Sequence, residues 1–278
     1  MPLQADRDEA LAFEKVKSIL PNPTVFAEPA GSATTFPDFG FRIMLGDKKT
    51  DIFFEFKQNH TAHMGSGSRD WIFDGTSFKL PQQAQTDQDK KDLIDIMNAV
   101  DQAKTKAKAI LNDLKNLASN QISSLSSASL GVLKTGEARK AGVTNYILNK
   151  KSDYQIAKID STIMGDKIIE LYKKKFRSSL RQDADLSIAF FMIKDTIWLV
   201  DKHGDWSKSN MDQLKMYFKT NTDFSMLDNL SAKLEVRIQP KPSFKEKNYS
   251  DPRLNSARLD TMAMFRLSKK PSGGSKII

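Results

Sequence analysis

Acidic residues and a lysine stand at the borders of two neighbouring apolar runs of this chain. Pro37-Asp38 lies just ahead of one run, and Glu55-Phe56-Lys57 ends the next. Successive side chains of a strand point to opposite faces, so Glu55 and Lys57, two residues apart, share a face. Two carboxylates and an amine are the groups needed to hold Mg²⁺ and to activate a water molecule against a phosphodiester.

Two alternating strands would bring these groups together. Residues 39–45 and 51–57 both alternate, and residues 46–49 between them have the composition of a hairpin turn. An antiparallel pair would place Asp38, at the start of one strand, beside Glu55, near the end of the other. The opposite face of the second strand carries apolar residues that we assign to the core, namely Ile52, Phe54 and Phe56.

Two alternatives stay open for these residues. Asp51 shares the face of Glu55, so it can replace or assist Asp38 as a metal ligand, or it can be a surface acid near the turn. Glu55 and Lys57 can also form an ordinary ion pair on the solvated face of a strand, with Pro37-Asp38 merely starting a turn.

With this pattern the chain resembles the PD-(D/E)XK nuclease superfamily, the fold of many restriction enzymes, over residues 7–80. The resemblance implies that Asp38 and Glu55 bind the metal ion and that Lys57 is the catalytic lysine. It further implies Mg²⁺ as the cofactor, which Mn²⁺ can replace, and DNA as the substrate.

The superfamily often adds an acid from the helix that precedes the hairpin. Apolar residues recur with helical spacing from about residue 8 to residue 20, and the Pro-Asn-Pro of residues 21–23 ends that pattern. Glu14, or else Glu9, is the acid that this helix offers as a further metal ligand.

The charge of the chain favours a polyanionic partner. The formal net charge is +9, and residues 134–181 carry twelve Lys or Arg against five Asp or Glu. The predicted nucleic-acid-binding residues are Lys173, Lys174, Lys175, Arg177 and Arg181, which follow an apolar helical pattern and can contact phosphates. The alternative is a solvated helix end, where cations are favoured by the helix dipole.

The sequence contains no cysteine, and no apolar stretch approaches the length of a membrane span. Disulfides and thiolate metal sites are therefore excluded. We expect a soluble, cytoplasmic protein with no membrane partner, and an intracellular protein of bacterial or phage origin fits the resemblance.

The rest of the sequence divides into several segments. A helical pattern extends over residues 92–117, and a Ser-rich stretch follows it. Strands are predicted within 186–200, 234–238 and 259–267. We expect a nuclease-core part at 1–118, a linker at 119–130, a basic helical and β-rich part at 131–267, and a disordered basic tail at 268–278.

Together these features predict an α+β protein. Its core would be a restriction-endonuclease-like mixed β-sheet flanked by helices, with a helical insertion and a β-rich carboxyl-terminal part that completes the core or binds DNA. The leading hypothesis is a Mg²⁺-dependent DNA nuclease, an endonuclease that acts as a homodimer. The alternative is a non-catalytic nucleic-acid-binding or assembly protein whose acids are incidental.

Overall fold

A computed structural model describes most of the chain and divides it into two compact units. The described residues are 4–29, 36–60, 62–64, 71–73, 75–79, 88–99, 101–102, 104–105, 108–109, 155–220, 222–238 and 259–277. The first unit comprises residues 1–64, 160–232 and 266–278, and the second comprises 65–159 and 233–265. These units do not follow the boundaries expected from the sequence, and the linker predicted at 119–130 lies outside the described residues.

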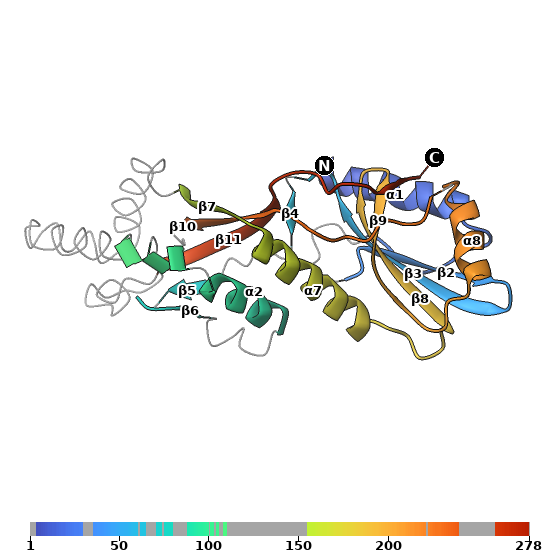
Figure 1. Ribbon diagram of the computed structural model, residues 1–278, viewed down its shortest axis with the longest axis horizontal. Coiled ribbons are helices and arrows are strands. Elements are labelled where there is room, and N and C mark those ends of the chain that lie inside the picture. Colours follow the sequence, from blue (N-terminus) through green and yellow to red (C-terminus); the bar gives the residue numbers. More distant parts are fainter. Residues whose placement is uncertain are drawn as a thin grey trace, which may run out of the picture. The chain divides into compact units, whose positions relative to one another are not determined.

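The first unit is built on a mixed, six-stranded open sheet (Figure 1). Its strands, in spatial order, are β1 (Thr24–Ala27), β2 (Phe39–Leu45), β3 (Lys48–Lys57), β8 (Leu186–Ile193), β9 (Thr196–His203) and β12 (Ser275–Lys276). Strands β3 and β8 are parallel, and the other neighbouring pairs are antiparallel. The short strand β4 (His63–Met64) also belongs to this unit. The α+β class and the mixed sheet expected from the sequence are thus confirmed.

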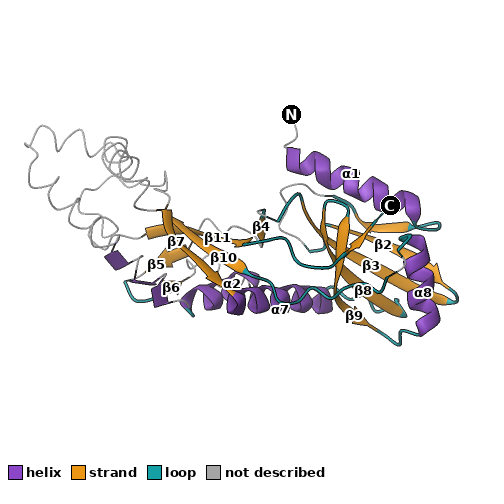
Figure 2. Ribbon diagram, turned by 45° about the horizontal axis from the view of Figure 1, so that its top comes forward, coloured by secondary structure: helices purple, strands orange, loops and turns teal. Residues whose placement is uncertain are grey.

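Three helices cover the two faces of this sheet. Figure 2 shows α7 (Thr162–Ser178) on the opposite side of the sheet from α1 (Gln4–Ile19) and α8 (Lys208–Tyr217). On the side of α1 and α8, Phe54 of β3 packs in a core that includes Phe13 of α1 and Phe218 at the end of α8. On the other side, the ring of Phe53 meets that of Phe176 of α7, with centroids 5.3 Å apart. The central strands are therefore buried on both faces.

Burial on both faces explains the composition of the central strands. A strand covered by helices on both faces reads as a continuous apolar run rather than as an alternating one. Strand β8, with the sequence LSIAFFMI, is buried along its whole length, and β3 is buried from Thr50 to Phe56. The face that carries Glu55 is accordingly not a solvated strand face, since Glu55 is only 7% exposed.

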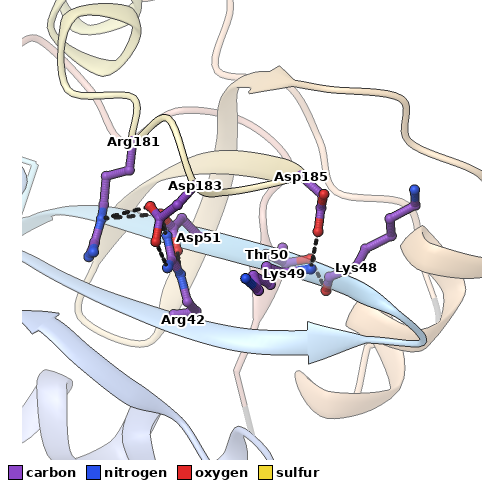
Figure 3. Close-up of polar contacts among 8 residues, drawn as sticks. All are labelled: Arg42, Lys48, Lys49, Thr50, Asp51, Arg181, Asp183 and Asp185. Carbon is purple, nitrogen blue, oxygen red and sulfur yellow. Dashed lines mark hydrogen bonds and ion pairs between the residues drawn. The ribbon is translucent and has the colours of Figure 1, made fainter.

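An ion-pair network fixes the register between β2, β3 and the loop that leads into β8 (Figure 3). The guanidinium of Arg42 donates to both oxygens of Asp51, directly opposite it on β3, at 2.6 and 2.9 Å, and also to Asp183. The carboxylate of Asp185 accepts from the backbone N–H of Lys49 at 2.7 Å, and its own N–H donates to the carbonyl of Lys49 at 2.9 Å. Residues far apart in sequence are thereby joined at one end of β3.

The second unit contains a separate sheet and one described helix. The strands, in spatial order, are β6 (Phe78–Lys79), β5 (Trp71–Phe73), β11 (Leu259–Leu267), β10 (Ala232–Ile238) and β7 (Gln155–Ser161). The helix is α2 (Gln88–Asn98). The side-chain amide of Asn98 accepts a hydrogen bond from the backbone N–H of Phe78 at 2.7 Å and donates one to the carbonyl of Phe78 at 2.9 Å. The strands predicted at 234–238 and 259–267 are confirmed.

The carboxyl-terminal segment differs from the disordered tail expected over 268–278. Residues 275–276 form β12, which pairs with Ile197 and Thr196 of β9, and the side chain of Ile277 is fully buried in the core. The high content of Lys, Ser and Gly suggested disorder, but a two-residue edge strand and one buried isoleucine are enough to hold this backbone. Among the helices that the structure describes, none is both long and apolar enough to cross a membrane.

The ion-pair network generates a stability prediction. Arg42→Ala would leave the fully buried carboxylate of Asp51 without its bidentate partner, and breaking such a pair costs about 3 kcal/mol of unfolding free energy. Lys48→Ala, at an exposed position of the same hairpin, should change that free energy by no more than about 0.5 kcal/mol. Urea denaturation of the two variants would measure the difference, and equal effects would show that the network contributes little.

Candidate active site

Asp38 is fixed at the entrance of β2 by two contacts with β3. Its backbone N–H donates to the carbonyl of Phe54 at 3.0 Å, and its side-chain Oδ2 accepts from the backbone N–H of Phe56 at 2.6 Å. The hairpin pairing between β2 and β3 continues through Asp38, so backbone groups of β3 hold the carboxylate against the end of that strand. This is the placement predicted from the alternating strands.

Glu55 and Lys57 lie beside Asp38 on the face of β3 that α7 covers. The ammonium Nζ of Lys57 donates to Glu55 Oε1 at 2.6 Å and lies 3.6 Å from Asp38 Oδ2. It also donates to the carbonyl of Phe56 at 2.9 Å. The side chains of Asp38, Glu55 and Lys57 are only 17, 10 and 14% exposed. The structure thus brings the three predicted residues into one half-buried cluster.

The cluster strongly perturbs the protonation of its members. Burial, followed by repulsion from Glu55, raises the pKa of Asp38 to about 7, although Lys57 and the Phe56 N–H act in the opposite direction. Burial opposes the charge of Lys57, but attraction by Glu55 and Asp38 outweighs it, and the pKa of Lys57 is raised. Lys57 is therefore a protonated ammonium, a group that stabilises negative charge and does not act as a base.

The helix α1 brings a third acid, Glu9, within electrostatic reach of this cluster. Burial, opposed by Lys57 and reinforced by Asp6 and Glu55, raises the pKa of Glu9 to about 7, and Glu9 in turn raises the pKa of Asp38. The end of β3 is tied to this helix, because Gln58 Nε2 donates to Asp8 Oδ2 at 2.6 Å.

The two helix acids named from the sequence are thus separated by the structure. Glu9 lies within the electrostatic reach of the cluster, whereas Glu14 is exposed on α1 and does not enter the electrostatics of Asp38. Asp51 also lies outside the cluster. Its fully buried carboxylate is engaged by Arg42, and Arg181 lies 3.8 Å from it.

Tyr172 is a member of the cluster that the sequence did not indicate. Its ring packs on Phe191, centroid to centroid 5.7 Å, and Phe191 is the residue of β8 paired with Glu55. Burial, the charge of Glu55 and a hydrogen-bonding interaction with Glu55 raise the pKa of Tyr172. Among the described residues the buried hydroxyl has no hydrogen bond of standard geometry, so the interaction with Glu55 is a distorted one. In the sequence this tyrosine is only one apolar position of a helical stripe.

The predicted nucleic-acid-binding residues differ in burial and in ion pairing. Lys175 is buried at 9% exposure, a correction to its expected role, because its helical phase turns it toward the sheet. Lys173 pairs with Glu170 at 2.9 Å, and Arg177 pairs with Asp201 at 2.8 Å. Arg177 is nevertheless exposed, and so are Lys174 on α7 and Arg181, whose guanidinium lies 5.0 Å from the ring centroid of Phe26.

The donor set of the cluster suits a hard divalent cation. Within the described ranges, no three His, Asp or Glu side chains are grouped as a metal site, and the Lys57 ammonium lies close to both Asp38 and Glu55. Asp38 Oδ1 accepts no hydrogen bond from any described residue, and Glu55 engages Lys57 through Oε1. The carboxylates of Asp38 and Glu55 are hard oxygen donors, and Mg²⁺ is commonly bound by one or two carboxylates with water completing its shell.

Comparison of this chain with protein-family models, curated proteins and solved structures found no match. Functional interpretation therefore depends on the geometry of the cluster and on the residue pattern that produces it.

The raised pKa of Asp38 predicts a pH-dependent gain in stability for Asp38→Asn. The folded protein keeps a proton that the unfolded chain releases between about pH 4 and pH 7, so ionisation of Asp38 lowers stability as the pH rises through this window. In EDTA at pH 8, the unfolding free energy of Asp38→Asn should exceed that of the native protein by several kcal/mol, since each pKa unit corresponds to about 1.4 kcal/mol. This advantage should shrink as the pH falls toward 4.

Thermal unfolding of both proteins across that pH range measures this effect. A difference in melting temperature that is the same at every pH, or a variant less stable at pH 8, would contradict the electrostatic assignment.

The hydroxyl of Tyr172 makes no hydrogen bond of standard geometry to any described residue, and this predicts that Tyr172→Phe is stabilising. A buried polar group without a partner costs about 1 kcal/mol or more, and phenylalanine keeps the ring contact with Phe191. The matched control is Tyr217→Phe on α8, which removes the hydrogen bond from Gln213 Nε2 to the tyrosine hydroxyl at 2.8 Å. Chemical denaturation should show a gain for the first variant and none for the second, and a decrease in stability in Tyr172→Phe would indicate a hydrogen-bonded hydroxyl.

Proposed function

We propose that this chain is a Mg²⁺-dependent DNA nuclease that hydrolyses phosphodiester bonds. The observation that carries the proposal is the convergence of Asp38, Glu55 and Lys57 in one half-buried cluster. Residues at the two ends of a hairpin are brought together there, and they supply the two carboxylates and the ammonium that a metal-assisted hydrolysis needs. The mixed sheet flanked by helices also agrees with the restriction-endonuclease-like core that the resemblance to PD-(D/E)XK nucleases implies.

Each residue of the cluster has a role in this proposal. Asp38 and Glu55 hold Mg²⁺, which Mn²⁺ can replace, and Glu9 is the helix acid within electrostatic reach of them. The metal ion supplies an activated water molecule and polarises the phosphate when it is bound. Lys57, as a fixed ammonium in a site of low exposure, stabilises the negative charge that develops on the phosphate.

The buried setting of the cluster supports this division of roles. Two carboxylates close together in a site of low dielectric repel one another, and a cation relieves that repulsion. The single charge of Lys57 leaves the pKa of Asp38 raised to about 7, so the cluster is under-compensated at neutral pH. A divalent ion would complete the compensation.

We favour an endonuclease that acts as a homodimer in the cytoplasm. Two copies of one site can cut the two strands of a duplex, and a net charge of +9 suits a polyanionic substrate. The competing function is a non-catalytic nucleic-acid-binding or assembly protein. The exposed cations Lys174 and Arg181 fit this binding function as well as they fit the nuclease. A binding function, however, does not explain why buried acids lie beside a lysine.

Cleavage of supercoiled plasmid and long linear DNA tests the proposed function. With Mg²⁺ or Mn²⁺ the native protein should nick or cut, and EDTA should abolish the reaction. Asp38→Asn, Glu55→Gln and Lys57→Ala should each lower the rate at least about a hundredfold, because each removes a charge that acts on the reacting phosphate. Asp47→Asn, an exposed acid in the turn between β2 and β3, should cut at the native rate.

The two acids of α1 provide a second matched pair in this assay. Glu9→Gln should slow cleavage, whereas Glu14→Gln, on the same helix but exposed, should not. Intact DNA, RNA and branched DNA under every metal condition, together with salt-sensitive binding, would replace the nuclease with the binding function.

A further inference from the structure

The carboxyl-terminal strand places a lysine in line with Lys57. Lys57 pairs with Ile193 of β8, Ile193 with Thr196 of β9, and Thr196 with Lys276 of β12. Residues directly paired across neighbouring strands project from the same face of a sheet. Lys57 and Lys276 therefore lie in one row and on one face, with Lys276 at the outer edge of the sheet.

A second lysine from the same segment joins this face. Nζ of Lys270 lies 3.5 Å from Oγ1 of Thr196 and 5.7 Å from the ring centroid of Trp198. Trp198 pairs with Phe191, and Phe191 pairs with Glu55, so the ring of Trp198 is also on the face of the candidate active site. Lys270 and Lys276 thus flank Thr196 at the end of the row that begins at Lys57.

The backbone that carries these lysines is firmly attached to the sheet. The N–H of Ile277 donates to the carbonyl of Asp195 at 2.7 Å, and the indole N–H of Trp198 donates to the carbonyl of Ser272 at 2.9 Å. At Gly274, with φ of +91°, a Cβ atom would lie 2.6 Å from the ring of Trp198. Only glycine allows the segment to approach this closely, so the position of the lysines is built into the fold.

The charge of the segment has one sign. Residues 266–278 contain four Lys or Arg and no acid, and the carboxylate described beside Lys276 is that of Asp195, at 3.4 Å. The side chain of Lys276 remains 71% exposed. Three strand spacings separate it from Lys57, or about 14 Å. This span corresponds to about four nucleotides of one strand at about 3.4 Å each.

We propose that Lys270 and Lys276 form a track that binds the phosphate backbone of a nucleic acid next to the candidate active site. This inference rests on the proposed function, because the track leads to Lys57 of the candidate active site. It adds the surface that holds the substrate strand beside the cluster, on a segment that the sequence pattern assigned to disorder.

The salt dependence of DNA binding tests the track independently of cleavage. Binding of a fluorescent duplex would be followed by anisotropy in EDTA over a series of KCl concentrations, for the native protein, Lys270→Gln, Lys276→Gln and the double variant. The matched control is Lys48→Gln with Lys49→Gln, exposed lysines at the other end of β3, about 30 Å from Lys57. Glutamine removes the charge while keeping a polar, flexible side chain, and its shorter stem is common to the variants and the control.

Each lysine that binds a phosphate contributes about 1 to the slope of log affinity against log salt concentration. The slope of the double variant should therefore be smaller in magnitude than the native slope by about 2, and the slope of the control should equal the native one. Equal slopes in all proteins, equal decreases in the double variant and the control, or no binding by the native protein would overturn the track.

The binding and cleavage assays separate the track from the proposed function. If the slopes change as expected while the variants of Asp38 and Lys57 leave plasmid cleavage unaffected, the nuclease fails and the track stands. If cleavage depends on that cluster while the slopes are unchanged, the track fails and the nuclease stands.

Discussion

The parallel pairing of β3 with β8 is the interaction on which the rest of the first unit depends. It joins residues 50–57 to residues 186–193, two segments separated by more than a hundred positions of the chain. The pairing is closed at both ends: Asp185 bonds to the backbone of Lys49 at one end, and the N–H of Lys194 donates to the carbonyl of Lys57 at the other, at 3.2 Å. Glu55 and Lys57 are positioned by this frame, because both belong to the paired stretch.

Burial of β3 on both faces gives the cluster its chemistry. In water, the ion pair between Glu55 and Lys57 would be weak and would perturb its neighbours little. Beneath α7, burial and repulsion from Glu55 raise the pKa of Asp38, and attraction by the acids keeps Lys57 protonated. The buried hydroxyl of Tyr172, which lacks a hydrogen bond of standard geometry among the described residues, belongs to the same environment, in which a poorly satisfied polar group is costly. Packing and reactivity therefore have a common origin in this unit.

Local periodicity was enough to predict the centre of the cluster and not enough to predict its surroundings. The convergence of Asp38, Glu55 and Lys57 follows from the pleat and from a short hairpin. Asp51 shares their face, but four residues of strand place it about 13 Å from Glu55, and its partner Arg42 is known only from the register. Glu9 and Glu14 stand about 140° apart around a helix, so only one can face the sheet. Which one does so depends on how α1 docks.

Contacts between distant segments account for what the sequence did not reveal. Strand β12 is two residues long and exists because β9 offers it a free edge. Tyr172 reaches the cluster only because α7 packs over Phe191. Neither relation leaves a periodic signal in the chain.

The order in which the sheet receives its strands has a consequence for biosynthesis. Strands β1 to β3 are made first, and the partner of β3 follows only after residues 58–185 have been synthesised. At about 5–20 residues per second, this interval lasts on the order of ten seconds. Throughout it, the apolar edge of β3 is an unpaired template for other strands. We therefore expect the nascent chain to need shielding by chaperones or by the ribosome surface at this stage. A sheet whose neighbouring strands follow one another in sequence would need less.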